Sequence, residues 1–397
     1  MTAPAKQHLI DPEICIRCYT CENTCPIEAI THNDDNVVVD FDKCDHCMDC
    51  IPVCPTGSID EWRVVETPYS LDEQFEWMEL PEQQEFGASA SEAQTGLEAL
   101  DDATAKLLAE AHAGAGGKAK APASAAKPSI NLHNLSRPAE MVVQGNYRLT
   151  DDPGHDVRHI ILDAGSQPFP VLEGQSIGII APGMDGDGKP HLPRLYSVSS
   201  PRDGERPNYN NLSLTVKREE SGVCSNYVCD LKQGDKVSVT GPFGSTFLMP
   251  SDPNARLLMI CTGTGSAPFR AFTMRRQRNN PDAVGGMVLI FGARTPNSLP
   301  YFGPLKKVPE SLLEKHLVFS RMEGEPKRHV QDQLRDMEDD VAALLVDPNT
   351  YIYICGLRAM EEGVDAALTT ISESMGEQWH NVRDVMRQEG RFHVETY

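Results

Sequence analysis

The sequence has little positive charge and no long apolar run. It holds 36 Lys and Arg against 58 Asp and Glu, which gives a formal net charge of −22 at pH 7. Because binding to nucleic acid requires the opposite sign of charge, we expect no nucleic-acid partner. No run of about 18 apolar residues occurs, so we expect no membrane span and no membrane partner. The first residues also lack the apolar core of a secretory signal, which indicates a cytoplasmic protein.

The catalytic motifs of hydrolases and oxygenases are missing as well. The sequence contains no nucleophile elbow. A di-iron carboxylate centre needs two Glu-x-x-His pairs and two further glutamates, whereas this chain offers only the pair Glu377 and His380. Any oxygen activation coupled to this protein would therefore belong to another polypeptide.

Cysteine, in contrast, is abundant and follows a repeated spacing. Eight of the 12 cysteines form two runs of the pattern C-x2-C-x2-C-x3-C-P. In bacterial ferredoxins this pattern holds two 4Fe–4S clusters, and the fourth cysteine of each run serves the other cluster. A zinc site would favour two well-separated C-x2-C pairs, and a disulfide framework would favour a secreted chain. We therefore assign the cluster 1 ligands as Cys15, Cys18, Cys21 and Cys54, and the cluster 2 ligands as Cys44, Cys47, Cys50 and Cys25.

Charge and composition change along the chain. Residues 1–87 hold 19 acidic and 4 basic residues. This excess of negative charge could steer an electron carrier to a basic acceptor, or it could serve only to keep the chain soluble. Within this part, the capping-box spacing of Ser70 and Glu73 predicts a short helix inside residues 68–81. Residues 88–130 contain 15 alanines and no aromatic residue, so they predict a flexible linker.

The rest of the sequence predicts two further domains. Short β-rich runs separated by turns fill residues 140–250 and indicate an antiparallel barrel. After residue 250, strands alternate with helices, which is typical of a parallel sheet with crossover helices. The predicted fold class is multidomain: an α+β bacterial-type ferredoxin, an antiparallel β-barrel for a flavin, and an α/β parallel-sheet domain for a nicotinamide nucleotide. We place the ferredoxin domain at residues 1–65, the acidic, alanine-rich linker at 66–135, the barrel at 136–250 and the nucleotide domain at 251–397.

Two short segments have the chemistry to bind a flavin. Arg194, Tyr196 and Ser197 offer a cation for a phosphate, a ring for stacking and a hydroxyl for a reacting nitrogen. Gly222 opens a predicted helix whose free N–H groups can bind a pyrophosphate. Each segment alone could equally be an ordinary strand or an ordinary capped helix.

Five motifs in order resemble the ferredoxin–NADP reductase family: RLYS, GVCSNYVCDL, GTGSAPFR, CGLRAMEEGVDAAL and GRFHVETY, over about residues 138–397. The resemblance implies FAD and NADPH as cofactor and substrate. The FAD site would comprise Arg194, Tyr196, Ser197, Lys217, Gly222, Val223, Cys224, Ser225 and Tyr397. The NADP site would comprise Thr262, Gly263, Thr264, Gly265 and Cys355. The residues around the reacting rings would be Ser197, Cys355, Glu395 and Tyr397, with Tyr397 stacked on the isoalloxazine until it moves aside.

Four donors after the strand HLVF favour NADPH over NADH. They are Ser320, Arg321, Lys327 and Arg328. Three of them are cationic, which suits a 2′-phosphate, whereas a site for NAD would place a carboxylate there. His329 stands where the family has a tyrosine that stacks on the adenine. The alternative is a solvated basic turn.

The whole arrangement resembles the reductase components of benzoyl-CoA oxygenase systems. This resemblance implies that electrons pass from NADPH through FAD and the clusters to a di-iron benzoyl-CoA epoxidase in aerobic benzoate breakdown. Two alternatives stay open. The chain could serve another acceptor or make NADPH from reduced ferredoxin, because cluster potentials span a wide range. It could also be a non-enzymatic electron carrier with a decayed flavin domain, although the intact motifs argue against decay.

Overall fold

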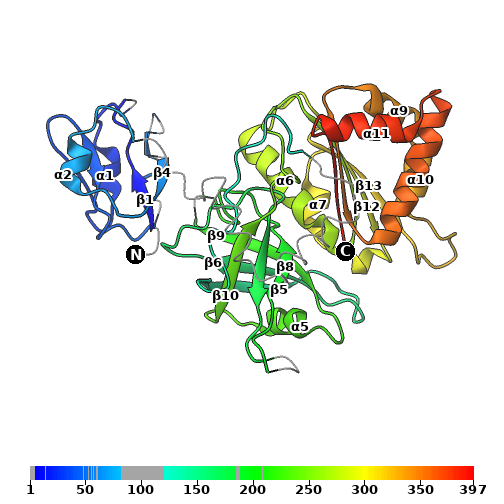
Figure 1. Cartoon of the computed structure of the whole chain (residues 1–397), viewed down its shortest axis with the longest axis horizontal. Coiled ribbons are helices and arrows are strands. Elements are labelled where there is room, and N and C mark those ends of the chain that lie inside the picture. Colours follow the sequence, from blue (N-terminus) through cyan, green and yellow to red (C-terminus); the bar gives the residue numbers. More distant parts are fainter. Residues whose placement is uncertain are drawn as a thin grey trace.

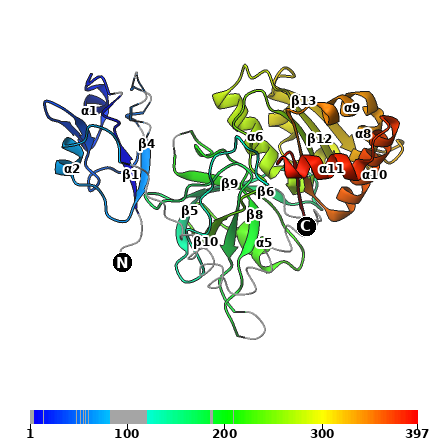
Figure 2. The same cartoon turned by 45° about the horizontal axis from the view of Figure 1, so that its top comes forward.

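The computed structural model has a small N-terminal module and a larger part built on two sheets (Figure 1, Figure 2). The structure describes residues 5–13, 15–47, 49–51, 53–54, 56, 58–59, 61–81, 120–184, 188–207 and 209–397. Most of the predicted linker falls on residues 82–119, outside the described ranges. No helix within the described ranges is both long and apolar enough to cross a membrane.

Two antiparallel strand pairs form the N-terminal module. β1 (Ala5–Leu9) pairs with β4 (Glu61–Val65), so the two ends of this unit lie side by side. α1 (Thr20–Thr24) precedes a hairpin of β2 (Ile30–His32) and β3 (Val37–Val39). One apolar core joins these elements, consisting of Ile10, Cys21, Ile30, Val37, Val39, Cys50 and Ile59. The predicted α+β class of the module is confirmed.

The helix predicted inside residues 68–81 is present as α2 (Leu71–Phe75). Its reciprocal capping box is formed: Glu73 N donates to Ser70 Oγ at 3.3 Å, and Ser70 N donates to Glu73 Oε2 at 2.7 Å. Each bond satisfies a backbone N–H that has no partner inside the helix. The sequence signal for this helix start is therefore confirmed.

Two buried amides attach α2 to the module: Gln74 of the helix exchanges hydrogen bonds of 3.2 and 3.0 Å with the backbone of Val39, and Asn36 binds the end of the helix. Asn36 Nδ2 donates to the carbonyl oxygens of Gln74, Phe75 and Trp77 at 3.3, 3.1 and 2.7 Å. Such bonds satisfy the carbonyl groups that the end of a short helix leaves free. The packed unit thus continues past residue 65 to Trp77, while the domain boundary itself stays a prediction.

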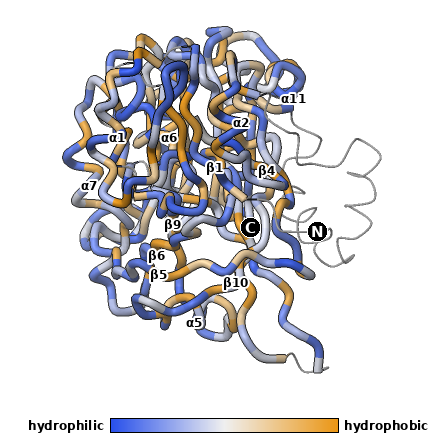
Figure 3. The backbone as a smooth tube through the Cα atoms, turned by 90° about the vertical axis from the view of Figure 1, so that its left-hand side faces the viewer, coloured by the Kyte–Doolittle hydropathy of each residue, from blue (hydrophilic) through white to orange (hydrophobic). Residues whose placement is uncertain are grey.

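Six antiparallel strands form the barrel, in the order β8-β7-β10-β5-β6-β9. They are β5 (Ala139–Arg148), β6 (Val157–Asp163), β7 (Ser176–Ile180), β8 (Arg194–Ser197), β9 (Asn211–Lys217) and β10 (Lys236–Phe243). A bridge between Val198 and Leu214 links the two outer strands of this order and closes the sheet. Figure 3 shows hydrophobic stretches where β5 and β6 run, and alternate residues of β5 are buried. The predicted antiparallel barrel is confirmed.

Five parallel strands form the second sheet, in the order β13-β12-β11-β14-β15. They are β11 (Arg256–Thr262), β12 (Met287–Ala293), β13 (Leu313–Phe319), β14 (Thr350–Gly356) and β15 (Phe392–Thr396). The longer connections carry α6 (Ser266–Asn279), α7 (Phe302–Lys307), α8 (Val330–Asp336), α9 (Glu338–Val346), α10 (Arg358–Ser374) and α11 (Trp379–Gln388). The predicted α/β domain is confirmed.

Helices cover both faces of this sheet, because successive residues of a strand point to opposite sides. In β11, Leu258 and Ile260 join a core that includes side chains of α8 to α11. Met259 and Cys261 join a second core with side chains of α6 and α7. Both faces being buried explains why the strands read as nearly continuous apolar runs.

An ion pair joins α6 to the barrel. Arg270 donates to the two carboxylate oxygens of Glu205, at 2.7 Å each, and only 20% and 16% of these side chains are exposed. Burial would raise the pKa of Glu205, but hydrogen bonds from His159 and Arg270 lower that pKa well below its ordinary value. Arg278, on the same helix, donates to Asp203 at 3.1 Å. The acidic segment of the barrel around residue 205 is thus held against α6.

A buried tyrosine adds a second tie between the two domains. Tyr301 precedes α7, and its hydroxyl lies 2.9 Å from His159 Nδ1 and 2.7 Å from Thr215 Oγ1. His159 lies on β6 and Thr215 on β9, so the tie reaches two strands of the barrel. Burial raises the pKa of the Tyr301 hydroxyl, which therefore stays protonated and can donate to one of these partners.

Residues 120–137 form an arm that contacts both domains of the larger part. Ser251, just before β11, donates its N–H to the carbonyl oxygen of Ser124 at 3.2 Å. Further along, His133 and Gly241 exchange two backbone hydrogen bonds of 2.9 and 2.7 Å. The C-terminal part of the predicted linker is therefore packed against the folded domains.

Replacing Glu205 by Gln should lower the free energy of unfolding by about 2–3 kcal/mol, because the largely buried Arg270 loses its counter-charge. Urea unfolding followed by circular dichroism measures the loss. Glu140→Gln is the matched control, since it weakens the exposed pair with Lys236 and should cost about 0–1 kcal/mol. Equal losses in the two variants would show that the junction pair does not stabilise the fold.

Candidate functional site

The eight cysteines of the two runs gather around the core of the N-terminal module. All 12 cysteines of the chain are free thiols, so none of the eight is spent in a disulfide. The backbone between them turns sharply through left-handed conformations, at Arg17 (φ 53°), Tyr19 (φ 58°), Glu28 (φ 53°) and His46 (φ 62°). Such conformations are costly for residues other than glycine and concentrate at binding sites.

The first group of thiols combines three cysteines of the first run with one of the second. Burial raises the pKa of the Cys21 thiol to about 11, and the neighbouring Cys15, Cys54 and Cys18 thiols add to this rise. Cys54 also acts on Cys18, which is exposed. The structure thus brings together the four residues assigned to cluster 1.

The second group likewise combines three cysteines of the second run with one of the first. Burial raises the pKa of the Cys50 thiol to about 12, and Cys44 and Cys47 add to this rise. Burial also raises the pKa of Cys44, with a contribution from Cys25 of the first run. These are the four residues assigned to cluster 2. Cys21 acts weakly on Cys50 as well, so the two groups are neighbours.

The thiol groups fit four-iron clusters better than single ions. No three or more His, Cys, Asp or Glu side chains in the described part of the chain are arranged to hold one metal ion, as a tetrahedral zinc site would require. Hydrogen-bond donors face the sulfurs: Thr20 Oγ1 lies 3.4 Å from Cys18 Sγ, and Ala29 N lies 3.3 Å from Cys25 Sγ. Donors of this kind stabilise the negative charge of cluster-bound sulfur.

The predicted flavin residues of β8 lie next to the start of helix α5 (Val223–Asp230). The Tyr196 hydroxyl is buried and has no hydrogen-bond partner among the residues that the structure describes, which leaves it available to a bound group. The Cys224 thiol acts on it electrostatically but makes its own bond to the carbonyl oxygen of Ile179 at 3.5 Å. Ser197 Oγ accepts a bond of 3.4 Å from Ser176 Oγ, and Arg194 is exposed.

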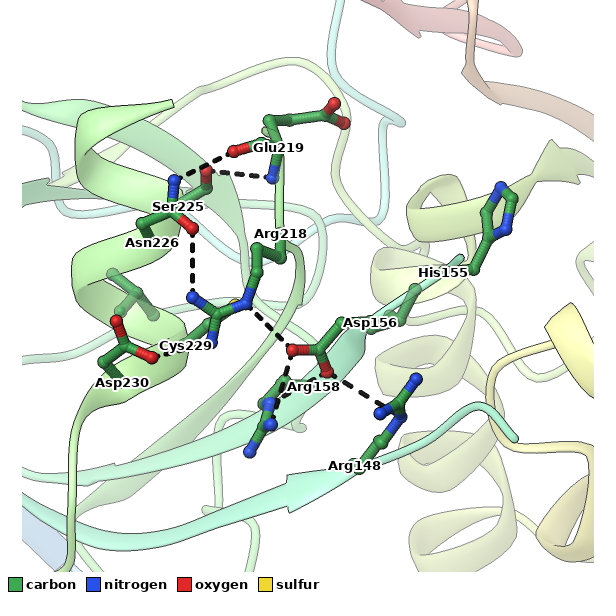
Figure 4. A network of polar contacts seen from close by, with 12 residues as sticks. Arg148, His155, Asp156, Arg158, Arg218, Glu219, Ser225, Asn226, Cys229 and Asp230 are labelled. Atoms are coloured by element: carbon green, nitrogen blue, oxygen red, sulfur yellow. Dashed lines mark hydrogen bonds and ion pairs between the residues drawn. The ribbon is translucent and has the colours of Figure 1, made fainter. Parts of the chain in front are cut away.

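A polar network holds the turn that leads into α5 (Figure 4). Arg218 donates to Asp156 at 2.9 Å and to Asn226 at 3.0 Å. Asn226 Nδ2 donates back to the carbonyl oxygens of Glu219 and Gly222 at 3.0 and 2.8 Å. The Asn226 side chain thus connects Arg218 to Glu219 and Gly222, the two ends of the turn. Asn226 belongs to the motif GVCSNYVCDL but was not among the predicted ligands, and Arg218 was not singled out from the sequence.

Gly222 is required at this turn. A Cβ atom at Gly222 would lie 2.4 Å from Ser225 Oγ. Ser225 needs this position, because its Oγ accepts from Glu219 N at 3.1 Å and donates to the carbonyl oxygen of Gly222 at 3.2 Å. The predicted ligand Lys217 is partly exposed and pairs with Glu219 at 2.7 Å. The first N–H groups of α5 are thus presented by a rigid turn.

The predicted nucleotide residues meet at the carboxyl edge of the parallel sheet. Strand pairing places Cys261, Cys355 and Glu395 in one row across β11, β14 and β15. Gly265, in the turn η2 (Gly263–Gly265), packs on this row, since a Cβ atom there would lie 2.1 Å from the carbonyl oxygen of Cys355. Within the described ranges the buried Thr262 hydroxyl has no partner, which again leaves a polar atom for a ligand.

Burial controls the charge of this row. It raises the pKa of the Glu395 carboxyl to about 8, so this group is mostly protonated at neutral pH. It also raises the pKa of the Cys355 thiol well above its usual range, and Glu395 and Cys261 add to the effect. The edge of the sheet therefore presents neutral groups.

Tyr397 connects this edge to the barrel. Its hydroxyl lies 2.6 Å from Thr264 Oγ1, in the turn η2, while 56% of the residue is exposed. Glu219, in the turn before α5, acts on Tyr397 electrostatically. The predicted flavin turn therefore lies near Tyr397, which contacts the predicted nucleotide turn directly.

The four predicted 2′-phosphate donors lie beyond β13. Ser320 N and Arg321 N donate to the carbonyl oxygens of Ala293 and Arg294 at 3.0 and 2.8 Å. These bonds continue the pairing of β13 with β12 past the end of the strand. The exposed side chains of Arg321 and Lys327 make no hydrogen bond or ion pair within the described ranges, whereas Arg328 is bound to Asp336. His329, predicted to stack on adenine, begins α8, and its N–H donates to Asp332 at 2.9 Å.

Comparison with known proteins assigns both parts of the chain. Residues 14–58 match the 4Fe-4S dicluster domain family, and residues 259–366 match the oxidoreductase NAD-binding domain family. The chain is 39% identical over 288 residues to the cyanelle ferredoxin–NADP reductase of Cyanophora paradoxa, covering 66% of this chain and 78% of that protein. It is 38% identical over 290 residues to the ferredoxin–NADP reductase of Thermosynechococcus vestitus, covering 68% and 75%.

Solved structures agree with this assignment. Ferredoxin–NADP+ reductase from Plasmodium falciparum has a TM-score of 0.55 at 25% identity, covering 68% of this chain and 99% of that one. The same enzyme with 2′P-AMP has the same TM-score and identity and is covered completely, at 100%. Such enzymes are NADP oxidoreductases, and their fold implies FAD and NADP. The chain therefore belongs to the ferredoxin–NADP reductase family and carries a 4Fe–4S ferredoxin domain ahead of its reductase part.

Proposed function

We propose that this chain is an NADPH-dependent reductase that delivers single electrons, by way of FAD and two 4Fe–4S clusters, to a separate oxygenase. One observation carries the proposal: a single chain holds two groups of four thiols and a junction of flavin and nucleotide residues centred on Tyr397. When bound, FAD takes two electrons from NADPH and returns them one at a time, and each cluster carries one electron.

The barrel residues would bind and orient the flavin. Arg194 and the N–H groups at the start of α5 suit its phosphates, and the unpaired Tyr196 hydroxyl suits a ribose or phosphate oxygen. Ser197 would lie near the reacting nitrogen. Arg218 and Asn226 would keep the phosphate-binding turn in place.

The residues at the sheet edge would receive the nicotinamide. The protonated Glu395 carboxyl and the Cys355 thiol place no negative charge there. Tyr397 covers the flavin side and excludes water until a nucleotide displaces it. Because the residue is half exposed and its side chain makes one hydrogen bond, the ring can move while the backbone bond of Tyr397 N to Gly356 stays in place.

The acceptor we propose is a di-iron benzoyl-CoA epoxidase of aerobic benzoate breakdown. Two features support this choice. The order of modules resembles the reductase components of such systems. The sequence also lacks the second Glu-x-x-His pair that its own di-iron centre would need.

Anaerobic titration of the purified chain with NADPH tests the proposal. Electrons should reach the candidate epoxidase with benzoyl-CoA present, and in its absence they should stay on the reduced chain. Cys18→Ser should abolish this delivery but leave NADPH-dependent reduction of ferricyanide intact, because ferricyanide takes electrons from the flavin. Loss of both activities would contradict separable modules, and an epoxidase that stays oxidised would refute the acceptor.

Arg321→Ala should raise the KM for NADPH by roughly tenfold or more and leave the KM for NADH unchanged, since a hydrogen bond to a charged group contributes about 1.5–3 kcal/mol. Arg328→Ala should have a smaller effect, because Arg328 is already bound to Asp336. A related structure contains 2′P-AMP, in line with such a site. Lys236→Ala, on the barrel, is the charge-matched control. Equal losses for both nucleotides would overturn the 2′-phosphate assignment.

Glu395→Gln should change how stability depends on pH. The folded pKa of about 8 exceeds the unfolded value of about 4.3, so the folded state binds the proton more tightly. Wild-type stability therefore falls as pH rises from about 4.3 to about 8, and the variant should lose this part of the slope. Urea unfolding across this range measures it, with Glu310→Gln as an exposed control. Parallel curves for wild type and Glu395→Gln would show that the carboxyl is charged at neutral pH.

A further inference from the structure

Side-chain hydroxyl groups surround the thiols of cluster 1. Thr20 Oγ1 donates to Cys18 Sγ at 3.4 Å. Ser58 Oγ and Thr56 Oγ1 lie 3.4 and 3.7 Å from Cys54 Sγ. Once the sulfur is bound to iron it has no proton, so each hydroxyl can only donate to it. Hydrogen bonds to cluster sulfur favour reduction, because reduction adds negative charge.

Carboxylates surround the thiols of cluster 2. Asp45 Oδ1 accepts the N–H of Cys47 at 3.1 Å, and Asp45 acts electrostatically on Cys44 as well. Asp49 acts on Cys47. These negative charges disfavour reduction of a group beside them. No carboxylate is among the main electrostatic influences on Cys18, Cys21 or Cys54 in the described part of the chain.

A buried histidine does not offset this difference. His8 Nε2 faces the carbonyl oxygen of Ile59 at hydrogen-bonding distance, so this nitrogen carries the ring proton. Nδ1 then presents a lone pair, and it lies 3.9 Å from Cys50 Sγ. It therefore gives no hydrogen bond to this sulfur.

The remaining donors and cations lie near both groups of thiols, and the cation Lys6 lies on the cluster 2 side. Main-chain N–H groups approach thiols of both groups, so they do not distinguish them. Lys43 pairs with Asp40 at 3.7 Å, and Lys6 acts on His8 and His46. Arg17, the cation of the loop between Cys15 and Cys18, belongs to the cluster 1 side and is exposed.

We propose that the two clusters have different reduction potentials, with cluster 1 the higher, and that electrons leave the protein from cluster 1. The inference rests on the proposed function, because it takes both clusters as bound. Thr20, Thr56 and Ser58 stabilise an added electron at cluster 1, while Asp45 and Asp49 oppose one at cluster 2. With both clusters bound, one electron would pass from cluster 2, which would be oxidised, to cluster 1, which would be reduced, with no bond or proton change.

Exposure agrees with this order. Cys18 is exposed, and the neighbouring Ile16 is 62% exposed, so a redox partner can approach cluster 1 closely. Each group has one buried thiol, Cys21 or Cys50, and apart from Cys18 its other thiols are partly buried, so the two groups differ in the exposed Cys18. The cluster that holds the electron more tightly is thus the one that a partner can reach.

An anaerobic redox titration of the full-length holoprotein, followed by electron paramagnetic resonance, tests the inference. We expect two signals whose potentials differ by at least about 59 mV, which is a tenfold preference for a one-electron couple. Thr20→Val and Ser58→Ala should lower only the higher potential. Asp45→Asn with Asp49→Asn should raise only the lower one, and the amide at 45 can still accept the N–H of Cys47. Asp72→Asn, an exposed charge on α2, should move neither signal.

Each other result overturns the inference. Two coincident potentials would show that the side chains do not separate the clusters. A rise of the higher potential in the aspartate variants would reverse the order. An iron content short of two four-iron clusters in the wild type would instead refute the proposed function itself. If the double variant assembles poorly, Asp45→Asn alone must raise the lower potential.

Discussion

The ion pair between Arg270 and Glu205 is the contact on which the reductase part depends. The flavin residues lie on the barrel and the nucleotide residues on the parallel sheet, so neither domain contains the whole site. Glu205 is held at the barrel by His159, and Arg270 belongs to the helix that directly follows the nucleotide turn. Because the pair is largely shielded from water, its attraction is less screened than that of a surface pair. Together with Tyr301 and Arg278, this pair sets how the barrel and the parallel sheet lie against each other.

The surroundings of the reacting groups differ between the two parts of the chain. At the sheet edge burial keeps the Glu395 carboxyl and the Cys355 thiol protonated, so charge is absent where a nicotinamide would bind. In the ferredoxin module the thiols are surrounded by unequal sets of polar groups, with hydroxyls at Cys18 and Cys54 and carboxylates at Cys47. The first arrangement suits the neutral ring of reduced nicotinamide. The second would give two otherwise similar metal clusters different reduction potentials.

Much of the fold was predictable because its signals are local. The strand–helix alternation, the barrel runs and the capping box of Ser70 and Glu73 all depend on residues close in sequence. The attachment of α2 by Asn36 was not predictable, because one asparagine far from the helix in sequence carries no visible signal. Likewise, nothing in the spacing showed that Arg328 would be bound to Asp336 or that residues 120–137 would pack on both domains.

The sequence by itself determined the chemistry available to this protein, since cysteine spacing and glycine turns restrict which groups can bind. It also determined the family, through five motifs in order. Only the tertiary structure decided which groups lie together: the row of Cys261, Cys355 and Glu395, the contact of Thr264 with Tyr397, and the hydroxyls beside Cys54. The physical reason is that charge, hydrogen bonding and burial act over a few ångströms in space, whatever the separation along the chain.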